Sequence, residues 1–183
     1  MQLSTSPAFL FPNTLKLRIS FLLTAIIFAG CLVNVAGASE SQRLTPARAA
    51  AVDRAVDAFM QTVAHSVTQD GPAAWLKYFG SGPAFFMAVN GQMAFPNAAA
   101  AQEGTRKFAQ TITHIELRWG DDLRVDPLTA DLAIVATSWR ETMVDVAGHR
   151  ADQAGYFTGL AEYRDGRWQF RDAHWSSPVP TSR

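Results

Sequence analysis

The stretch RDGRWQFRDAHWSSP, residues 164–178, contains a turn flanked by runs in which apolar and polar side chains alternate. Asp165-Gly166 is typical of a two-residue β-hairpin turn, because aspartate and glycine tolerate the positive φ that this turn requires. The flanking runs, 153–164 and 167–175, are rich in aromatic residues and predict two long strands. The sequence therefore predicts a long antiparallel hairpin, and the rest of the fold is best placed relative to it.

The two-residue turn also predicts the register of the hairpin. The expected pairs share the more apolar face: Tyr163 with Trp168, Ala161 with Phe170, Gly159 with Asp172, and Phe157 with His174. We expect this face to point toward the helices, with Gly159 leaving space beside the Asp172 carboxylate. Aromatic side chains near the turn and polar groups farther along are typical of a pocket. A β-bulge in either strand would exchange the two faces beyond it.

Asp172 and His174 are the candidate catalytic residues, because a buried imidazole beside a carboxylate can exchange protons near neutral pH. A structural role is the alternative, in which Asp172 hydrogen-bonds His174 or a backbone amide. Both interpretations stay open at this point. Further candidates for the pocket wall are the neighbouring hairpin positions Phe157, Gly159 and Phe170.

The N-terminal half has helical patterns. Thr45-Pro46 is a typical helix start, and apolar residues then recur every three or four positions, at Val52, Val56, Phe59, Val63 and Val67. Asp70-Gly71-Pro72 predicts the end of this helix and the start of a short second one. Asn90-Gly91 predicts a tight hairpin, and Pro96-Asn97 begins a third helix over residues 98–112.

From residue 114 the apolar period changes from helical to strand-like. HIELRW, residues 114–119, alternates strictly, and LAIVATSWRETMVDV, residues 132–146, is a long strand candidate. The second strand has apolar residues on both faces, so its inner face is not determined by the pattern. Trp139 and Glu141 share one face and are candidate ligand-binding residues if that face points inward. Helices followed by a strand meander predict an α+β fold.

This order of elements, with the ending YRDGRWQFRDAHWS at residues 163–176, resembles the nuclear transport factor 2-like superfamily and its SnoaL-like, ketosteroid-isomerase-like branch. The resemblance implies a cone-shaped barrel in which N-terminal helices pack on a curved antiparallel sheet and enclose a pocket. It covers residues 46–176, which is nearly all of the expected mature chain. Members of this family include isomerases, cyclases, dehydratases and binding domains. Many enzymatic members carry an acid near the first hairpin, but GSGPAFFMAVNGQ, residues 80–92, has none.

Composition argues against several kinds of partner. The 183 residues contain 16 basic and 16 acidic side chains, so no basic excess favours nucleic acid. His65, His114, His149 and His174 are scattered without ligand spacing, so we expect neither a metal nor any other cofactor.

The N-terminus has the pattern of an export signal. Lys16 and Arg18 precede an uncharged apolar run, residues 19–33, and Ala36-Gly37-Ala38 fits a signal-peptidase site. We expect a signal peptide over 1–38, an exported segment over 39–45, the domain over 46–177, and a tail over 178–183. An uncleaved anchor and a lipoprotein modified at Cys31 are the alternatives, and Cys31 is the sole cysteine. The mature protein would be periplasmic or secreted.

Two functions follow. The first is an exported domain that binds a small, partly apolar molecule, and the second is a cofactor-independent isomerase, cyclase or dehydratase using Asp172 and His174. The missing acid in residues 80–92 favours the first. The opposite face of the hairpin carries Tyr156, Leu160 and Trp175, and family members often dimerise through the sheet, so we expect a homodimer.

Overall fold

The computed structural model describes residues 44–178. The predicted signal peptide, the cleavage site after Ala38, the possible lipid anchor at Cys31 and most of the C-terminal tail lie outside this range. Within it, no helix combines the length and apolar character needed to span a bilayer.

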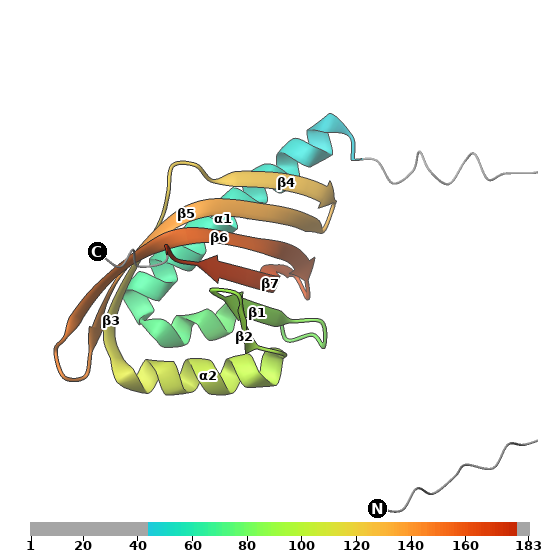
Figure 1. Ribbon diagram of the computed structural model, residues 1–183. Helices are drawn as coiled ribbons and strands as arrows, with labels where there is room; N and C mark the ends of the chain where they lie inside the picture. The colour runs from blue at the N-terminus through green and yellow to red at the C-terminus, as the bar shows by residue number, and fades with distance from the viewer. Residues whose placement is uncertain (1–43, 179–183) are drawn as a thin grey trace, which may run out of the picture. The chain divides into compact units, whose positions relative to one another are not determined.

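Helix α1 (Pro46–Asp70) begins and ends where the sequence predicts. It is capped by the Thr45 hydroxyl, which accepts a hydrogen bond from the Arg48 amide, and it ends at Gly71. Its predicted apolar stripe is buried, together with Met60. A short 3₁₀ helix, η1 (Pro72–Lys77), follows directly. Tertiary packing of the stripe therefore holds α1 against the sheet (Figure 1).

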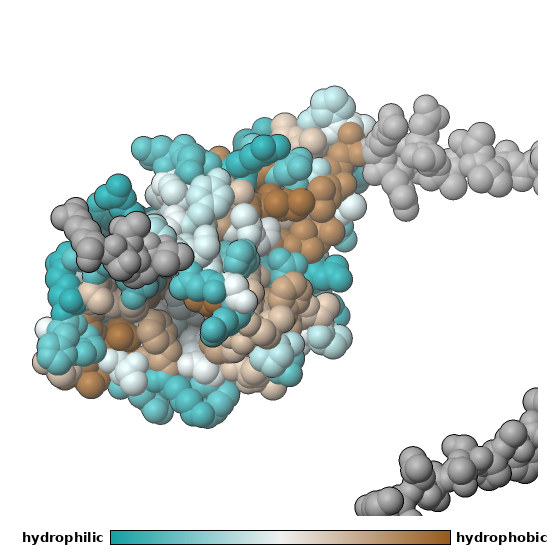
Figure 2. Space-filling view, viewed as in Figure 1, coloured by the Kyte–Doolittle hydropathy of each residue, from teal (hydrophilic) through white to brown (hydrophobic). Residues whose placement is uncertain are grey.

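The first hairpin and the third helix are also confirmed. Strands β1 (Phe86–Val89) and β2 (Gln92–Phe95) are joined by Asn90 and Gly91, both with positive φ. Helix α2 (Ala98–Thr111) is capped by the Asn97 side chain. Its outer side forms a hydrophilic band at the bottom of the view in Figure 2. The one difference is Ile112, which begins the next strand instead of ending the helix.

Seven strands form one sheet, with β2-β1-β7-β6-β5-β3 as the order and β4 paired to β5. The remaining strands are β3 (Ile112–Trp119), β4 (Arg124–Thr129), β5 (Leu132–Asp145), β6 (Arg150–Arg164) and β7 (Arg167–Ser176). All pairs are antiparallel except β1 with β7, which is parallel. The α+β fold with helices on a curved sheet is therefore confirmed, but the sheet is mixed and not purely antiparallel (Figure 1).

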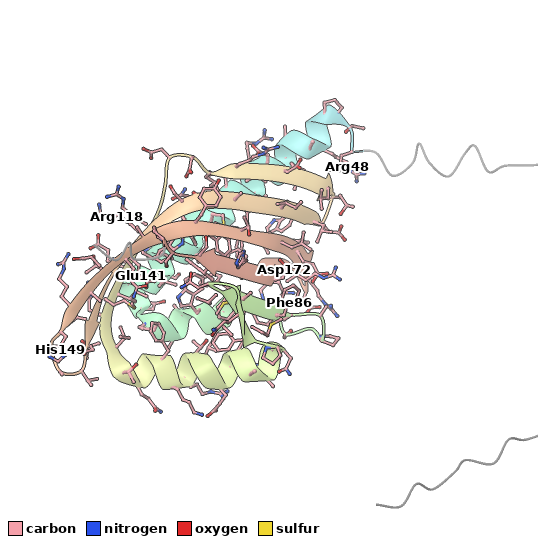
Figure 3. All side chains as sticks on the ribbon, viewed as in Figure 1. Arg48, Phe86, Arg118, Glu141, His149 and Asp172 are labelled. Carbon is pink, nitrogen blue, oxygen red and sulfur yellow. The ribbon has the colours of Figure 1, made fainter. Side chains whose placement is uncertain are left out.

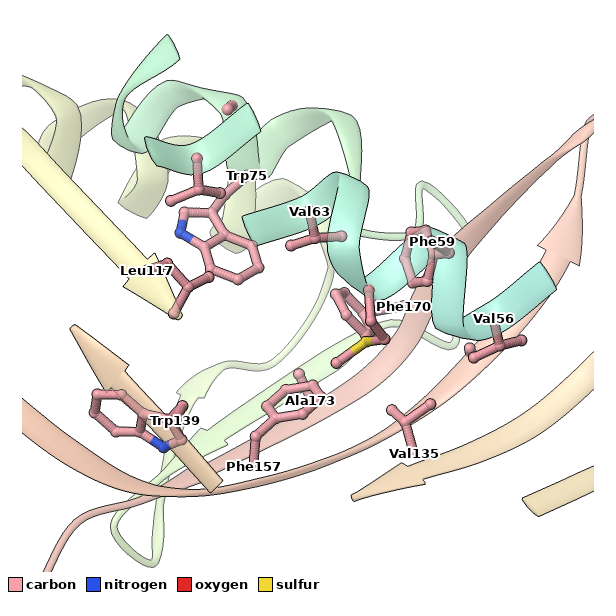
Figure 4. Packing of buried hydrophobic residues seen from close by; sticks show 14 of the residues in the cluster. Val56, Phe59, Val63, Trp75, Leu117, Val135, Trp139, Phe157, Phe170 and Ala173 are labelled. Carbon is pink, nitrogen blue, oxygen red and sulfur yellow. The ribbon is translucent and has the colours of Figure 1, made fainter. Parts of the chain in front are cut away.

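One hydrophobic core lies between α1 and the inner face of the sheet. Phe59 of α1 contacts Phe170 of β7 with ring centroids 4.9 Å apart, and Phe170 contacts Phe157 of β6 at 5.2 Å (Figure 4). Val56, Val135, Phe157 and Phe170 have no exposed surface. This packing fixes which face of each strand points inward.

The register of the β6–β7 hairpin is as predicted only near the turn. Tyr163 pairs with Trp168 and Ala161 with Phe170, but Leu160 then pairs with Asp172, so Arg171 is an extra residue in β7. This β-bulge exchanges the two faces of β7 beyond it. The prediction that Asp172 and His174 point inward is therefore wrong.

Candidate functional site

Strand β5 points its odd-numbered residues inward. Ala133, Val135 and Thr137 are completely buried, and Trp139 is 5% exposed, whereas Ile134 and Arg140 are exposed on the other face. Glu141 and Met143 continue the inner row. The question that the apolar pattern left open is thus decided by the packing against α1.

A cavity of about 470 Å³ opens on the inner face beyond the packed core. Strands β5, β6 and β7, the β1–β2 hairpin, η1 and α2 all contribute to its wall. The lining residues are Trp75, Phe79, Met87, Val89, Asn90, Ala94, Phe95, Thr105, Phe108, Trp139, Glu141, Met143, Gln153, Trp175 and Ser177. Its size and mostly apolar wall suit a small organic molecule.

Indole rings form one wall of this cavity. Trp175 lies between Trp75 and Trp139, with centroids 5.6 and 5.2 Å away and interplanar angles of 90° and 77°. Trp119 and Phe157 pack behind Trp175. This support holds the rings in place, so the wall is preformed. Trp175 was predicted on the outer face, and the bulge at Arg171 is what brings it to the cavity.

Glu141 is the titratable group of the cavity. Burial raises the pKa of its carboxyl group to about 7. Within residues 44–178 the carboxylate accepts no hydrogen bond and forms no ion pair, and desolvation is the cause of the shift. A carboxyl group with this pKa can give or take a proton at neutral pH.

The remaining polar groups of the cavity lie near its edge. Gln153 pairs with Glu141 across β5 and β6. The Asn90 side-chain oxygen accepts a hydrogen bond from the Ser177 amide at 2.7 Å, which ties the β1–β2 turn to the end of β7. The buried Trp139 indole N–H has no partner in the described part of the chain. These groups offer few, separated polar contacts.

Of the residues predicted to bind a ligand, Trp139 and Glu141 line the cavity. Phe157 and Phe170 belong instead to the packed core, and Gly159 is buried beside them. The expected space at Gly159 is filled, because a Cβ atom there would lie 2.8 Å from the Phe157 ring. Met143, Gln153 and Trp175 also line the cavity and were not predicted, although Met143 has the same strand parity as Glu141.

Asp172 and His174 lie on the outer face of the sheet, away from the cavity. Asp172 accepts a hydrogen bond from the Leu160 amide, and burial raises the pKa of its carboxyl group. Asp172 also lies beside Phe86, its partner on β1 (Figure 3). The His174 side chain is exposed. The two residues flank Ala173, and the structure does not bring them together with the cavity residues.

A second, polar cleft lies next to the cavity. Its charged residues are Glu116, Arg118, Arg140, Glu141, Arg150 and Asp152. Glu116 pairs with Arg118, and Asp152 with Arg150. Arg118 points away from the helices in Figure 3. Over residues 44–178, no group of three His, Cys, Asp or Glu side chains is placed to hold a metal ion.

No family model and no curated protein matches this chain. Several solved structures, in contrast, are similar to this chain. A nuclear transport factor 2-like superfamily protein from Salmonella enterica is 13% identical, with a TM-score of 0.58, over 76% of this chain and 96% of that one. A candidate scytalone dehydratase from Novosphingobium aromaticivorans is 12% identical, with a TM-score of 0.62, over 74% and 89%.

A hexachlorocyclohexane dehydrochlorinase has a TM-score of 0.56 at 14% identity, over 71% of this chain and 87% of that one. At these identities the likeness concerns the fold. The chain therefore has the nuclear transport factor 2-like fold, as the resemblance implied, and the SnoaL-like branch stays a prediction.

Proposed function

We propose that this chain binds a small, mostly apolar organic molecule in the cavity between the sheet, α2 and the β1–β2 hairpin. The observation that carries the proposal is a preformed cavity of about 470 Å³ with an aromatic wall and one unpaired carboxyl group. Ligand pockets commonly combine an apolar wall with a few polar groups that orient the ligand. No residue of the cavity requires a cofactor for this role.

Filling the cavity tests the proposal. Met143 is part of the wall, so Met143→Trp should occupy space that a ligand would use. Met93 is 59% exposed and outside the wall, so Met93→Trp is the matched control. The neutral dye Nile red should fluoresce with the wild type and with Met93→Trp, but much less with Met143→Trp. Native mass spectrometry of protein from its own host should show a retained ligand that Met143→Trp lacks. Equal dye binding by all three proteins would contradict the proposal.

A second candidate is a cofactor-independent enzyme in which Glu141 transfers a proton. The favouring observation is the pKa of about 7 in a mostly apolar cavity, which suits a general base. The version that uses Asp172 and His174 loses its support, since both face away from the cavity. An activated benzisoxazole opens when a base removes its carbon-bound proton, so it is a suitable probe. Turnover should rise through pH 7 and disappear in Glu141→Gln; equal turnover by this variant would exclude the role.

Export is proposed on the N-terminal pattern alone. A signal peptide over 1–38 would place the binding domain in the periplasm or outside the cell, where a ligand could be captured before uptake. N-terminal sequencing of the exported protein should give Ser39 as the first residue. A start at Met1, or a lipid on Cys31, would contradict cleavage after Ala38.

The homodimer is proposed on the outer face of the sheet. Three large apolar side chains are exposed on this face: Tyr156 (44%), Ile134 (42%) and Phe86 (42%), with Leu160 among them. Trp175 was also predicted on this face, but it lies on the inner face. Large exposed apolar side chains on one face favour association. Light scattering at micromolar concentration should give twice the monomer mass for the wild type and the monomer mass for Tyr156→Arg. A wild-type monomer would contradict the proposal.

A further inference from the structure

Glu141 is the one charged side chain among the described residues that line the cavity. Among residues 44–178 the wall contains no lysine, arginine or histidine, so this part of the chain places no cation in the cavity beside the carboxylate. An ionised carboxylate in a mostly apolar site is costly unless it is paired. The cavity therefore has a negative group whose partner has to come from elsewhere when Glu141 is ionised.

Aromatic side chains line the same space. Trp75, Phe79, Phe95, Phe108, Trp139 and Trp175 all line the cavity. The Trp75 and Trp139 rings stand nearly perpendicular to that of Trp175, so the indoles present their surfaces from different directions. The faces of aromatic rings carry negative partial charge and attract cations, indole most strongly. The wall and the carboxylate thus favour the same sign of charge in a ligand.

Trp139 and Glu141 are close enough to act on one group. They are two residues apart on β5 and share its inner face, which places their Cβ atoms about 6–7 Å apart. A nitrogen atom between the two side chains can contact both. The apolar remainder of a ligand would then lie against other lining residues, such as Met87, Val89 and Phe108.

We propose that the ligand of this cavity is an organic amine, whose protonated nitrogen pairs with Glu141 against the indole wall. This inference rests on the proposed function, because it names the class of molecule that the same cavity binds. A carboxylate or phosphate ligand would be repelled by an ionised Glu141. A neutral ligand would leave Glu141 without a partner whenever its carboxyl group is ionised.

The charged groups around Glu141 do not replace such a ligand. Arg140 is its neighbour on β5, with its side chain exposed on the other face. Arg118 and Glu116 on β3 pair with each other, as do Arg150 and Asp152 on β6. These are the other charged residues of the adjoining cleft, and none of them forms an ion pair with Glu141. Leu117 and Gln153, which pair with Glu141 on the neighbouring strands, are uncharged.

Probes that share one skeleton test the inference. The affinities of 2-(1-naphthyl)ethylamine, 2-(1-naphthyl)ethanol and 1-naphthylacetate are measured by calorimetry at pH 8, where the amine is protonated and Glu141 ionised. We expect the amine to bind about tenfold more tightly than the alcohol, as an ion pair with cation–π contacts would give. The carboxylate should bind most weakly. At pH 6, where Glu141 is mostly protonated, amine binding should weaken and release a proton.

Glu141→Gln should lose the preference for the amine, so that the amine and the alcohol bind this variant about equally. Glu103→Gln, the same change on the solvent side of α2, should behave like the wild type. Equal or tighter binding of the alcohol by the wild type would overturn the amine inference and leave the proposed function standing. Failure of all three probes and of Nile red to bind would overturn both.

Discussion

The inner face of the sheet has two ends that differ in what covers them. At one end, Ala133, Val135 and Thr137 of β5 are completely buried. At the other, Trp139, Glu141 and Met143 of the same strand line a cavity. Helix α1 packs on β3, β4 and β5, whereas α2 lies on the other side of η1, near the β1–β2 hairpin (Figure 1). We call these the closed end and the open end.

The difference shows that one strand pattern can serve two purposes. The inward positions of β5 alternate in the same way along its whole length, so the pattern itself does not distinguish the ends. What differs is the packing: the valines and Phe59 of α1 fill the closed end, while the open end keeps empty space. Truncation should therefore lower stability at the closed end and binding at the open end.

The largest expected effect is at Phe170 of the closed end. Phe170 has no exposed surface and contacts Phe59 and Phe157. Phe170→Ala should lower the free energy of unfolding by about 3–5 kcal/mol, because it leaves a cavity in a packed core. Met143→Ala should cost only about 1 kcal/mol, because the Met143 side chain already borders empty space. Urea denaturation measures both. Equal losses would show that the two ends are not energetically distinct.

The second effect concerns Glu141 and depends on pH. Its folded pKa of about 7 lies above the usual 4.5, so the folded protein retains a proton between these values that the unfolded chain has released. The associated stability is present below pH 4.5 and is lost as the pH rises through 7. Glutamine is never charged, so ligand-free Glu141→Gln should be more stable than the wild type by about 1–3 kcal/mol at pH 8 and about equally stable at pH 4.5. This range allows for the partial opening of the cavity to solvent.

Urea denaturation of the wild type, Glu141→Gln and Glu103→Gln at pH 4.5 and pH 8 measures this difference in the free energy of unfolding. Glu103 is exposed on α2 and pairs with Lys107, so its substitution should give no comparable gain at pH 8. A stability difference for Glu141→Gln that does not change with pH would mean that the open end does not desolvate this carboxyl group.

A smaller effect is expected at Trp168, beyond the closed end. Trp168 is half-buried and stands edge-to-face with Tyr163, which is itself 46% exposed. Trp168→Ala should cost about 1–2 kcal/mol, less than a fully buried aromatic residue. Nile red binding should not change, because Trp168 is outside the cavity wall. A loss as large as that of Phe170→Ala would place Trp168 in the closed end.

Local features of the fold could be predicted from the sequence because short stretches determine them. Thr45, Gly71 and the Asn90-Gly91 and Asp165-Gly166 turns all act where expected. The inner face of β5 could not be predicted, because both faces carry apolar residues and only contact with α1 distinguishes them. Glu141 and Trp139 were therefore candidates on a condition that the sequence did not settle.

The bulge at Arg171 could not be predicted for a different reason. No glycine or other local signal marks it, and the strand pattern fits either register. In the structure the extra residue places Ala173 and Trp175 inside, where small and aromatic side chains fit beside Phe157. Packing across the sheet selects the register with the bulge. A prediction without the bulge therefore assigns every residue of β7 after Arg171 to the wrong face.

The smallest expected effect, at His174, tests that register directly. His174 is exposed and pairs with Thr158 on the outer face, so His174→Ala should change the free energy of unfolding by less than about 0.5 kcal/mol. It should leave Nile red binding unchanged. Ala173 is 1% exposed on the inner face, so Ala173→His forces an imidazole into packed space and should be strongly destabilising. A hairpin without the bulge predicts the reverse order, because position 174 would then point inward and position 173 outward. Two single substitutions, compared by urea denaturation, therefore determine which residues of β7 face the cavity.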